Sequence, residues 1–261
     1  MAFLTHPPTI PSPSVQRTVS PEEWAVRVDL AAAYRLTALF GWDDLVFTHI
    51  SARVPGTHHF LINPYGLMFE EITASSLVKI DVDGNKIEPS PYPVNPAGFT
   101  IHSAVHETRD DAGCVMHTHS INGMAVSAQA DGLLPLTQSS LYVLASLGYH
   151  DYEGLAVNPD EKQRLVRDLG GKSVLMLRNH GLLTVGRTVA DAFIAMYFAE
   201  VACMVQVRAQ AGGVRLNHVP QPILDGIMAQ TRITTMDTGM DRLVWPGLLR
   251  RLDRRMPGYA D

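Results

Sequence analysis

Apolar residues recur three or four positions apart in several long stretches of the chain, which is the spacing of one buried helix face. The longest stretch predicts a helix over Val189–Ala211, closed by a pair of glycines. The first helix is predicted to begin after Ser20, an N-cap residue followed by Pro21, with Glu23 completing a capping box. It should end at Gly41. Further helices are predicted over residues 97–109, 121–129, 139–147, 159–169, 223–231 and 241–256.

Short segments rich in β-forming residues lie between turn residues, and predict strands over residues 50–54, 59–63, 78–82, 113–119, 173–177 and 182–185. Helices and strands do not alternate strictly. This favours one α/β domain with a mixed or antiparallel sheet over a parallel doubly wound one. Residues 1–19 contain four prolines and predict an extended arm that could wrap a neighbouring subunit. The domain would then cover residues 20–261, with a helical C-terminal extension.

Composition narrows the class of protein. The 261 residues are 46% hydrophobic and 18% charged, with a net charge of −5, so the chain can bury a core and has no general attraction to nucleic acid or anionic membranes. Two cysteines favour a reducing compartment, and we expect a cytoplasmic protein. We find no secretory pattern at the N-terminus and no stretch near the ~20 apolar residues of a membrane helix. Neither nucleic acid nor membrane is therefore an expected partner.

The strongest chemical signal is a pair of histidines, His117 and His119, on a predicted strand. Alternating side chains share a face of a strand, so the two imidazoles would project to the same side with Cα atoms about 6.6 Å apart. His180 lies at the end of another apolar strand and could be a third ligand. Three neutral histidines leave coordination positions open, as in catalytic metal sites. The alternative is three hydrogen-bonded core histidines, but the strand pair with a distant third histidine favours a metal.

Several stretches of the chain, from about Trp24 to Gly213, together resemble the class II aldolase/adducin family. The sequences of these stretches are closer to those of the adducin head domain and its bacterial relatives than to those of the sugar-phosphate aldolases. The matching stretches are Phe60-Leu61-Ile62-Asn63-Pro64-Tyr65-Gly66-Leu67, Ile72-Thr73-Ala74-Ser75-Ser76-Leu77, His117-Thr118-His119-Ser120, His150-Asp151-Tyr152-Glu153-Gly154 and Arg178-Asn179-His180-Gly181.

This resemblance implies a three-layer α/β/α fold with a central mixed or antiparallel sheet, and a homotetramer with active sites at subunit interfaces. It also implies a divalent metal, zinc first and Fe(II) or Mn as alternatives, on His117, His119 and His180. The implied activity is that of a metal-dependent lyase acting on a small hydroxy or oxo acid or a sugar-like substrate. Aldol cleavage, decarboxylation or dehydration would proceed through a metal-stabilised enolate.

One departure from the aldolases removes their catalytic carboxylate. The aldolases carry a glutamate four residues before the position of His102, and this chain has Gly98 there. His49 could move protons instead, because imidazole titrates near neutrality, although it could also be a hydrogen-bonded strand histidine. Glu71 and its neighbour Glu70 are alternatives, although exposed glutamates are usually solvated. Tyr152 could act as an acid or pack at an interface, and metal-bound hydroxide is a further option.

A second departure concerns the anion-binding residues. The aldolases use an Asn-x-Ser-x-Arg stretch near the substrate phosphate, and here His49 replaces the asparagine while Ser51 and Arg53 remain. Gly66 stands in the turn that corresponds to their second phosphate contact. These three residues are predicted to bind the anionic end of a small substrate, a carboxylate as readily as a phosphate. The alternative for Arg53 is an ordinary ion pair.

Two other functions stay open at this level. The loss of the glutamate at Gly98 favours a non-catalytic, adducin-like assembly module, whereas the intact histidine trio opposes it. Related sequences also include iron-dependent oxygenases acting on aromatic acids, so oxidative cleavage is a further alternative.

Overall fold

The computed structural model describes residues 15–154, 159–234 and 240–261. Within these ranges the chain forms a seven-stranded sheet in the order β3-β2-β1-β4-β7-β6-β5. The predicted arm lies mostly outside the described residues. Its last part contains one 3-10 turn, η1 (Val15–Arg17), where an extended segment was expected. The strands are β1 (His49–Arg53), β2 (Phe60–Ile62), β3 (Val78–Ile80), β4 (Cys114–Thr118), β5 (Leu147–His150), β6 (Val174–Leu177) and β7 (Gly181–Gly186).

The sheet is mixed, as predicted. Its neighbouring strands pair antiparallel except for β5 and β6, which run parallel at one edge. Strand β5 was not anticipated, because Leu147 was assigned to the end of a helix. The helix there, α4 (Gln138–Leu144), ends earlier. The next residues complete the edge of the sheet, a pairing that depends on a strand some thirty positions away in the chain.

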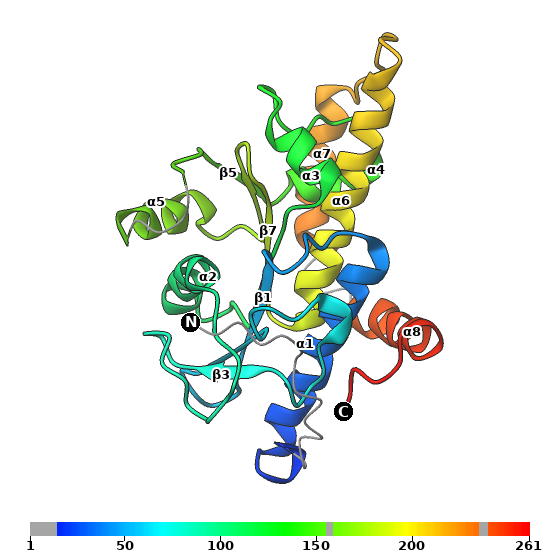
Figure 1. Cartoon of the computed structure of the whole chain (residues 1–261). Helices are drawn as coiled ribbons and strands as arrows, with labels where there is room; N and C mark the ends of the chain where they lie inside the picture. Colours follow the sequence, from blue (N-terminus) through cyan, green and yellow to red (C-terminus); the bar gives the residue numbers. More distant parts are fainter. Residues whose placement is uncertain (1–14, 155–158, 235–239) are drawn as a thin grey trace.

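Helices cover both faces of the sheet and give three layers (Figure 1). Helices α2 (Pro96–Thr108) and α5 (Pro159–Leu169) lie on one face. The long α6 (Val189–Ala211) packs against β4 and β7 on the other face, beside α1 (Pro21–Phe40), α3 (Ile121–Ser127) and α4. The C-terminal part of the chain adds α7 (Gln221–Thr234) and α8 (Met240–Arg255).

Strand alternation separates the two larger of the three hydrophobic clusters among the described residues; the third lies on β2 and β3. Ile50, Met116 and Leu182 face α1 and α6 and belong to the larger core. Val115 and Leu183, at the alternate positions, belong to the smaller core under α2 and α5. Because side chains two residues apart share a face, the odd-numbered histidines of β1 and β4 point toward the α2 layer.

Helix α6 corrects the expectation that no segment could span a membrane. It is 23 residues long and contains an 18-residue window with a mean hydropathy of 1.5, which is long and apolar enough by length and composition. A helix that is apolar on every side is either a membrane span or a buried core helix. Here 61% of its most apolar window is buried, and it contacts the sheet and α1, α3, α4 and α8, which is the packing of a core helix.

The start of α1 differs from prediction in one contact. The Ser20 hydroxyl accepts a hydrogen bond from the Glu23 amide at 3.1 Å, so the cap is present. The Glu23 carboxylate does not close a capping box. It lies instead between Arg27, at 2.9 Å, and Lys79, at 2.7 Å, where a buried ion-pair network joins α1 to β3. Pairing with Arg27 one turn along the helix and with the partly buried Lys79 of β3 takes the place of the local cap.

The C-terminal helical extension packs against the domain body. Helix α8 contacts α1 and α6, and its Trp245 and Leu252 are buried in the larger core. The Trp245 indole donates to Asp29 at 2.8 Å, and the backbone amide of Ala74 donates to the carbonyl of Tyr259 at 2.8 Å. The last residues of the chain are therefore fixed against the first helix.

Candidate metal centre

The register of two central strands brings three histidines together. In the antiparallel pair β4–β7, Thr118 lies opposite Leu182, so the end of β4 and the start of β7 share one edge. His117 lies in β4, His119 directly after it, and His180 in the turn before β7. One ring nitrogen from each histidine lies within 4.8 Å of the others. A tetrahedral zinc with bonds of ~2.1 Å needs nitrogens about 3.4 Å apart, so small side-chain rotations would close the site.

The turn that carries His180 explains which residues flank it in the sequence. Asn179 has a φ of 57°, the left-handed conformation that asparagine tolerates. A Cβ on Gly181 would lie 2.4 Å from the Thr118 carbonyl oxygen, so glycine allows β7 to approach β4. The Arg178 guanidinium donates to the Gln129 carbonyl at 2.8 Å and anchors the turn. The flanking residues of the motif thus shape the backbone that presents His180.

Hydrogen bonds select the ring nitrogen that His117 and His119 leave free. The Nδ1–H of His117 donates to the Leu182 carbonyl oxygen at 2.9 Å. The Nδ1–H of His119 donates to the Asp44 carboxylate at 2.9 Å. In both rings the Nε2 lone pair remains, and His119 Nε2 lies 2.9 Å from His180 Nε2. A carboxylate behind a histidine is a common support for a metal ligand, and sequence reasoning missed Asp44 because it lies 75 residues away.

The charge state of the trio suits a cation. Burial, followed by the neighbouring histidines, lowers the pKa of His117 well below 6.5. Burial and the nearby His119 lower the pKa of His180 to about 4. Both rings are therefore neutral at pH 7, which is the form that binds metal. The donor set, its orientation and its charge fit a divalent ion with open coordination positions.

A buried hydrogen-bonded chain adjoins this centre. His49 lies opposite His117 in the β1–β4 register, with ring centroids 5.2 Å apart. Its Nδ1 lies 2.8 Å from His102 Nε2 on α2. Ser51 Oγ lies 2.7 Å from His102 Nδ1 and 2.8 Å from His106 Nε2, and His106 Nδ1 lies 3.0 Å from the Ala112 carbonyl oxygen. We call His49, His102, Ser51 and His106 the histidine chain.

The histidine chain is uncharged at neutral pH. Burial is the largest cause that lowers the pKa of His49 to about 3, and nearby histidines add to it. Burial likewise lowers the pKa of His106 to about 3 and that of His102 well below 6.5. Each ring therefore carries one proton and one lone pair, which makes the chain a set of directional donors and acceptors.

His49 occupies the space that a side chain at position 98 would need. A Cβ added to the buried Gly98 would lie 2.3 Å from His49 Cδ2 and 2.7 Å from its Nε2. The glycine predicted to mark the missing aldolase glutamate is thus the residue that admits the His49 ring. The two positions at which the resemblance implied a departure from the aldolases, 49 and 98, therefore lie in contact.

The three residues predicted to bind an anion have the following surroundings in the structure. The Ser51 hydroxyl is buried and bonded to two histidines of the chain. Arg53 donates to the carbonyls of His106 and Arg109 at the end of α2, and so caps that helix. Gly66 lies in an exposed turn with a φ of 106°. Ser51 and Arg53 thus make contacts within the protein, and anion binding by these three residues stays a prediction.

The two remaining candidates for proton transfer are placed very differently. Glu71 is exposed, and its carboxylate accepts from the Met68 amide at 2.8 Å, closing the 3-10 turn η2 (Phe69–Glu71). Tyr152 is 54% exposed, and its ring centroid lies 6.3 Å from that of His180. The structure therefore places Tyr152 beside the trio and gives Glu71 a local capping contact.

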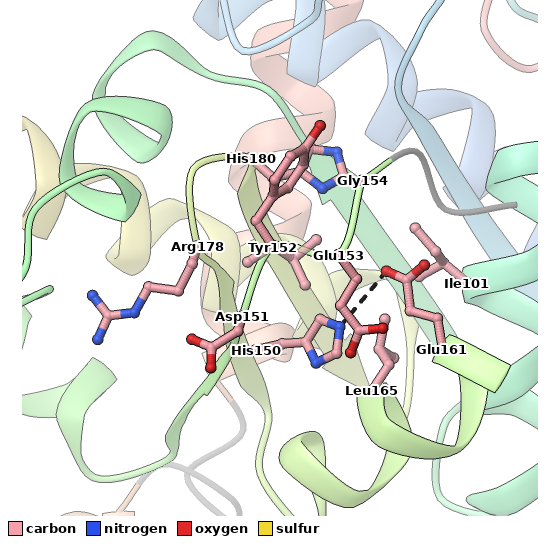
Figure 2. Close-up of a pocket in the computed structure, with 11 residues that line it drawn as sticks. Ile101, His150, Asp151, Tyr152, Glu153, Gly154, Glu161, Leu165, Arg178 and His180 are labelled. Atoms are coloured by element: carbon pink, nitrogen blue, oxygen red, sulfur yellow. Dashed lines mark ion pairs between the residues drawn. The ribbon is translucent and has the colours of Figure 1, made fainter. Parts of the chain in front are cut away.

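A small pocket adjoins the trio on the side of Tyr152 (Figure 2). His180 and Tyr152 lie at one end, and His150 lies at the other. His150 is buried between Asp168, whose carboxylate is 2.8 Å from Nδ1, and Glu161, 3.6 Å from Nε2. Sequence reasoning did not single out this group, because its members come from β5 and from two turns of α5.

Comparison with known proteins gives the family of the chain. The model of the class II aldolase and adducin N-terminal domain family matches residues 28–207. A Pseudomonas aeruginosa protein with a provisional aldolase class 2 name is 60% identical over 247 residues, which cover 94% of this chain and 95% of that protein. The solved structure of an L-fuculose 1-phosphate aldolase from Glaciozyma antarctica superposes with a TM-score of 0.76 at 26% identity, covering 96% of each chain.

Adducins are similar over a shorter stretch. Mouse alpha-adducin is 48% identical over 197 residues, which cover 73% of this chain and 27% of the adducin. The chain described here belongs to the class II aldolase and adducin family. Its three-layer fold with a mixed sheet is the class II aldolase fold, as the sequence resemblance implied.

Proposed function

We propose that this chain is a metal-dependent lyase of the class II aldolase type, acting on a small hydroxy or oxo acid or a sugar-like substrate. The observation that carries the proposal is the convergence of His117, His119 and His180, all within 4.8 Å at their ring nitrogens, beside a histidine whose ring fills the space at Gly98. A bound divalent cation, zinc first and Fe(II) or Mn as alternatives, would polarise a substrate carbonyl and stabilise negative charge on its oxygen.

In this proposal the proton is moved by His49. Its Nδ1 is bonded to His102, so Nε2 is the nitrogen that can accept a proton from a substrate carbon or hydroxyl. General base catalysis of this kind contributes about 10²–10⁴ in rate. Tyr152, exposed beside His180, is the group placed to return a proton to the product. Cleavage of a carbon–carbon bond needs both transfers, one at each end of the bond.

The rest of the proposal concerns substrate charge, assembly and location. The similar structure from Glaciozyma antarctica is named an L-fuculose 1-phosphate aldolase, which supports an anionic small-molecule substrate. The exposed apolar residues Leu45 and Phe47, beside the Asp44 that supports His119, suit a homotetramer with the site at a subunit interface. The free and buried cysteines, Cys114 and Cys203, are compatible with a cytoplasmic location.

The first experiment measures metal content. The full chain, purified without added metal and then equilibrated with Zn²⁺ or Fe²⁺, should bind about one ion per chain, and His117→Gln should abolish this binding. The matched control is His218→Gln, which replaces an exposed histidine outside the site. Failure of wild-type protein to bind either ion would overturn the lyase and favour an assembly module, for which the alpha-adducin similarity is the supporting observation.

The second experiment identifies the reaction. The metal-loaded chain is screened against hydroxy acids, oxo acids and sugar phosphates, under air and under anaerobic conditions. A lyase gives the same cleavage products in both atmospheres. Product formation that requires oxygen would replace the lyase by an iron oxygenase.

A further inference from the structure

The hydrogen bonds of the histidine chain can be oriented from one end. The Ala112 carbonyl oxygen has no hydrogen, so His106 Nδ1 must donate to it across 3.0 Å. The neutral His106 then offers a lone pair at Nε2, and the Ser51 hydroxyl donates to it across 2.8 Å. A serine has a single hydroxyl hydrogen, so Ser51 Oγ must accept from His102 Nδ1.

The same reasoning fixes the tautomer of His49. With its proton on Nδ1, the neutral His102 has a lone pair at Nε2, to which His49 Nδ1–H donates across 2.8 Å. Of the three proton-free Nε2 atoms in the histidine chain, that of His49 is the one that accepts no hydrogen bond from another member. One backbone carbonyl, more than 60 positions from His49 in the sequence, therefore sets the direction of every bond between them.

We propose that Ser51, His102 and His106 are positioning residues that hold His49 as its Nδ1–H tautomer and keep its Nε2 lone pair available beside the histidine trio. The inference rests on the proposed function, in which that lone pair accepts the substrate proton. It also assigns Ser51 a different task from the anion binding that the sequence resemblance implied.

Reversing the donor–acceptor direction of the hydrogen bonds in the histidine chain is unfavourable. It would place the His106 Nδ1 lone pair against the Ala112 carbonyl oxygen, leaving two buried acceptors face to face without a hydrogen. The chain members are at most 3% exposed, so water has little access to relieve that contact.

Neutron diffraction from deuterium-exchanged crystals of the full chain at neutral pH tests the proposal directly. In the wild-type chain we expect deuterium on Nδ1 of His49, His102 and His106 and on Ser51 Oγ directed at His106. Deuterium on His49 Nε2 with Nδ1 bare would overturn the proposal. This readout does not depend on any variant folding.

Variants then test whether Ser51 sets the tautomer. In Ser51→Ala, His102 Nδ1 loses its acceptor, and we expect the deuterium of His49 to move to Nε2. Ser51→Thr keeps a hydroxyl and should keep the wild-type pattern. Ser140→Ala removes a serine that is equally buried in α4 and should change nothing in the chain. Retention of the wild-type pattern in Ser51→Ala would refute a positioning role.

Zinc content separates this proposal from the proposed function. If the trio binds zinc but His49 carries its deuterium on Nε2, the positioning chain fails and the metal site stands. If the deuterium positions are as expected but zinc does not bind, the positioning role of the histidine chain is supported and the proposed lyase function is refuted. Once a substrate is identified, metal-loaded Ser51→Ala should have a kcat at least tenfold below that of the metal-loaded wild type, with a smaller effect on KM. Ser51→Thr should keep the wild-type kcat.

Discussion

His49 and Gly98 exclude each other's side chains. A Cβ at position 98 would lie 2.3 Å from His49 Cδ2, far inside van der Waals contact. We therefore expect Gly98→Ala to lower the free energy of unfolding by about 1–3 kcal/mol, the usual cost of overpacking a buried site, as measured by urea denaturation. Gly226→Ala is the matched control. It lies in α7 with no neighbour within 4 Å, so alanine should be neutral or stabilising there by up to about 1 kcal/mol.

The same pair predicts a coupling between the two positions. Asparagine at position 49 removes the imidazole ring, so His49→Asn should relieve much of the cost of Gly98→Ala. A double-mutant cycle should give an interaction energy of at least about 0.5 kcal/mol, with the double variant more stable than the sum of the single changes predicts. Strict additivity would contradict the contact.

Asp44 should tune the metal affinity through His119. Its carboxylate accepts the Nδ1 hydrogen at 2.9 Å and keeps Nε2 free for the ion. Asp44→Asn removes this negative acceptor, and we expect zinc affinity to fall about 10–100-fold in a chelator competition assay. The neighbouring Asp43→Asn changes the same charge without a hydrogen bond to a trio histidine among the described residues, and should have a much smaller effect. Equal losses in both variants would indicate a general charge effect.

Stability of the metal-free chain should depend on pH through its buried histidines. The pKa of His49 and of His106 is lowered to about 3, and that of His180 to about 4, whereas the reference value is 6.5. Between these values the unfolded chain binds more protons than the folded chain. The free energy of unfolding should therefore fall as pH decreases below about 6.5, by up to about 1.4 kcal/mol per pH unit for each group.

Urea denaturation at about pH 7.5 and about pH 5.5 measures this dependence. His49→Gln removes one of the depressed groups and should flatten the curve. His218→Gln removes an exposed histidine and should leave its slope as in the wild type. A slope unaffected by either change would mean that His49 is not held neutral in the folded chain.

Tyr152 should affect turnover without affecting stability or metal binding. It is 54% exposed, so Tyr152→Phe should change the free energy of unfolding by no more than about 0.5 kcal/mol. If its hydroxyl returns a proton, the metal-loaded variant should lose about 10²–10⁴ in kcat on the substrate found by screening. Tyr197→Phe changes a tyrosine on α6 that packs against Phe40 and Trp42, and should retain activity. Comparable kcat values in all three proteins would remove Tyr152 from the mechanism.

Local patterns in the sequence predicted most elements but not the contacts between them. Val189–Ala211 was predicted with its observed bounds, because helical periodicity and a glycine stop are encoded within a few neighbouring positions. The edge strand β5 was missed, since its four residues become a strand through pairing with β6. Arg53 was placed in the anion site by motif, whereas the end of α2 offers it unpaired carbonyls that no local pattern reveals.

The sequence by itself determined the α/β composition, the shared face of two strand histidines and the glycine at position 98. These features depend on backbone geometry and side-chain alternation, which act over short distances along the chain. Tertiary structure alone decided that Asp44 supports His119, that His49 fills the space at Gly98, and that the Ala112 carbonyl orients the histidine chain. Hydrogen bonds between distant segments depend on sheet register and helix placement, which arise from packing the whole chain.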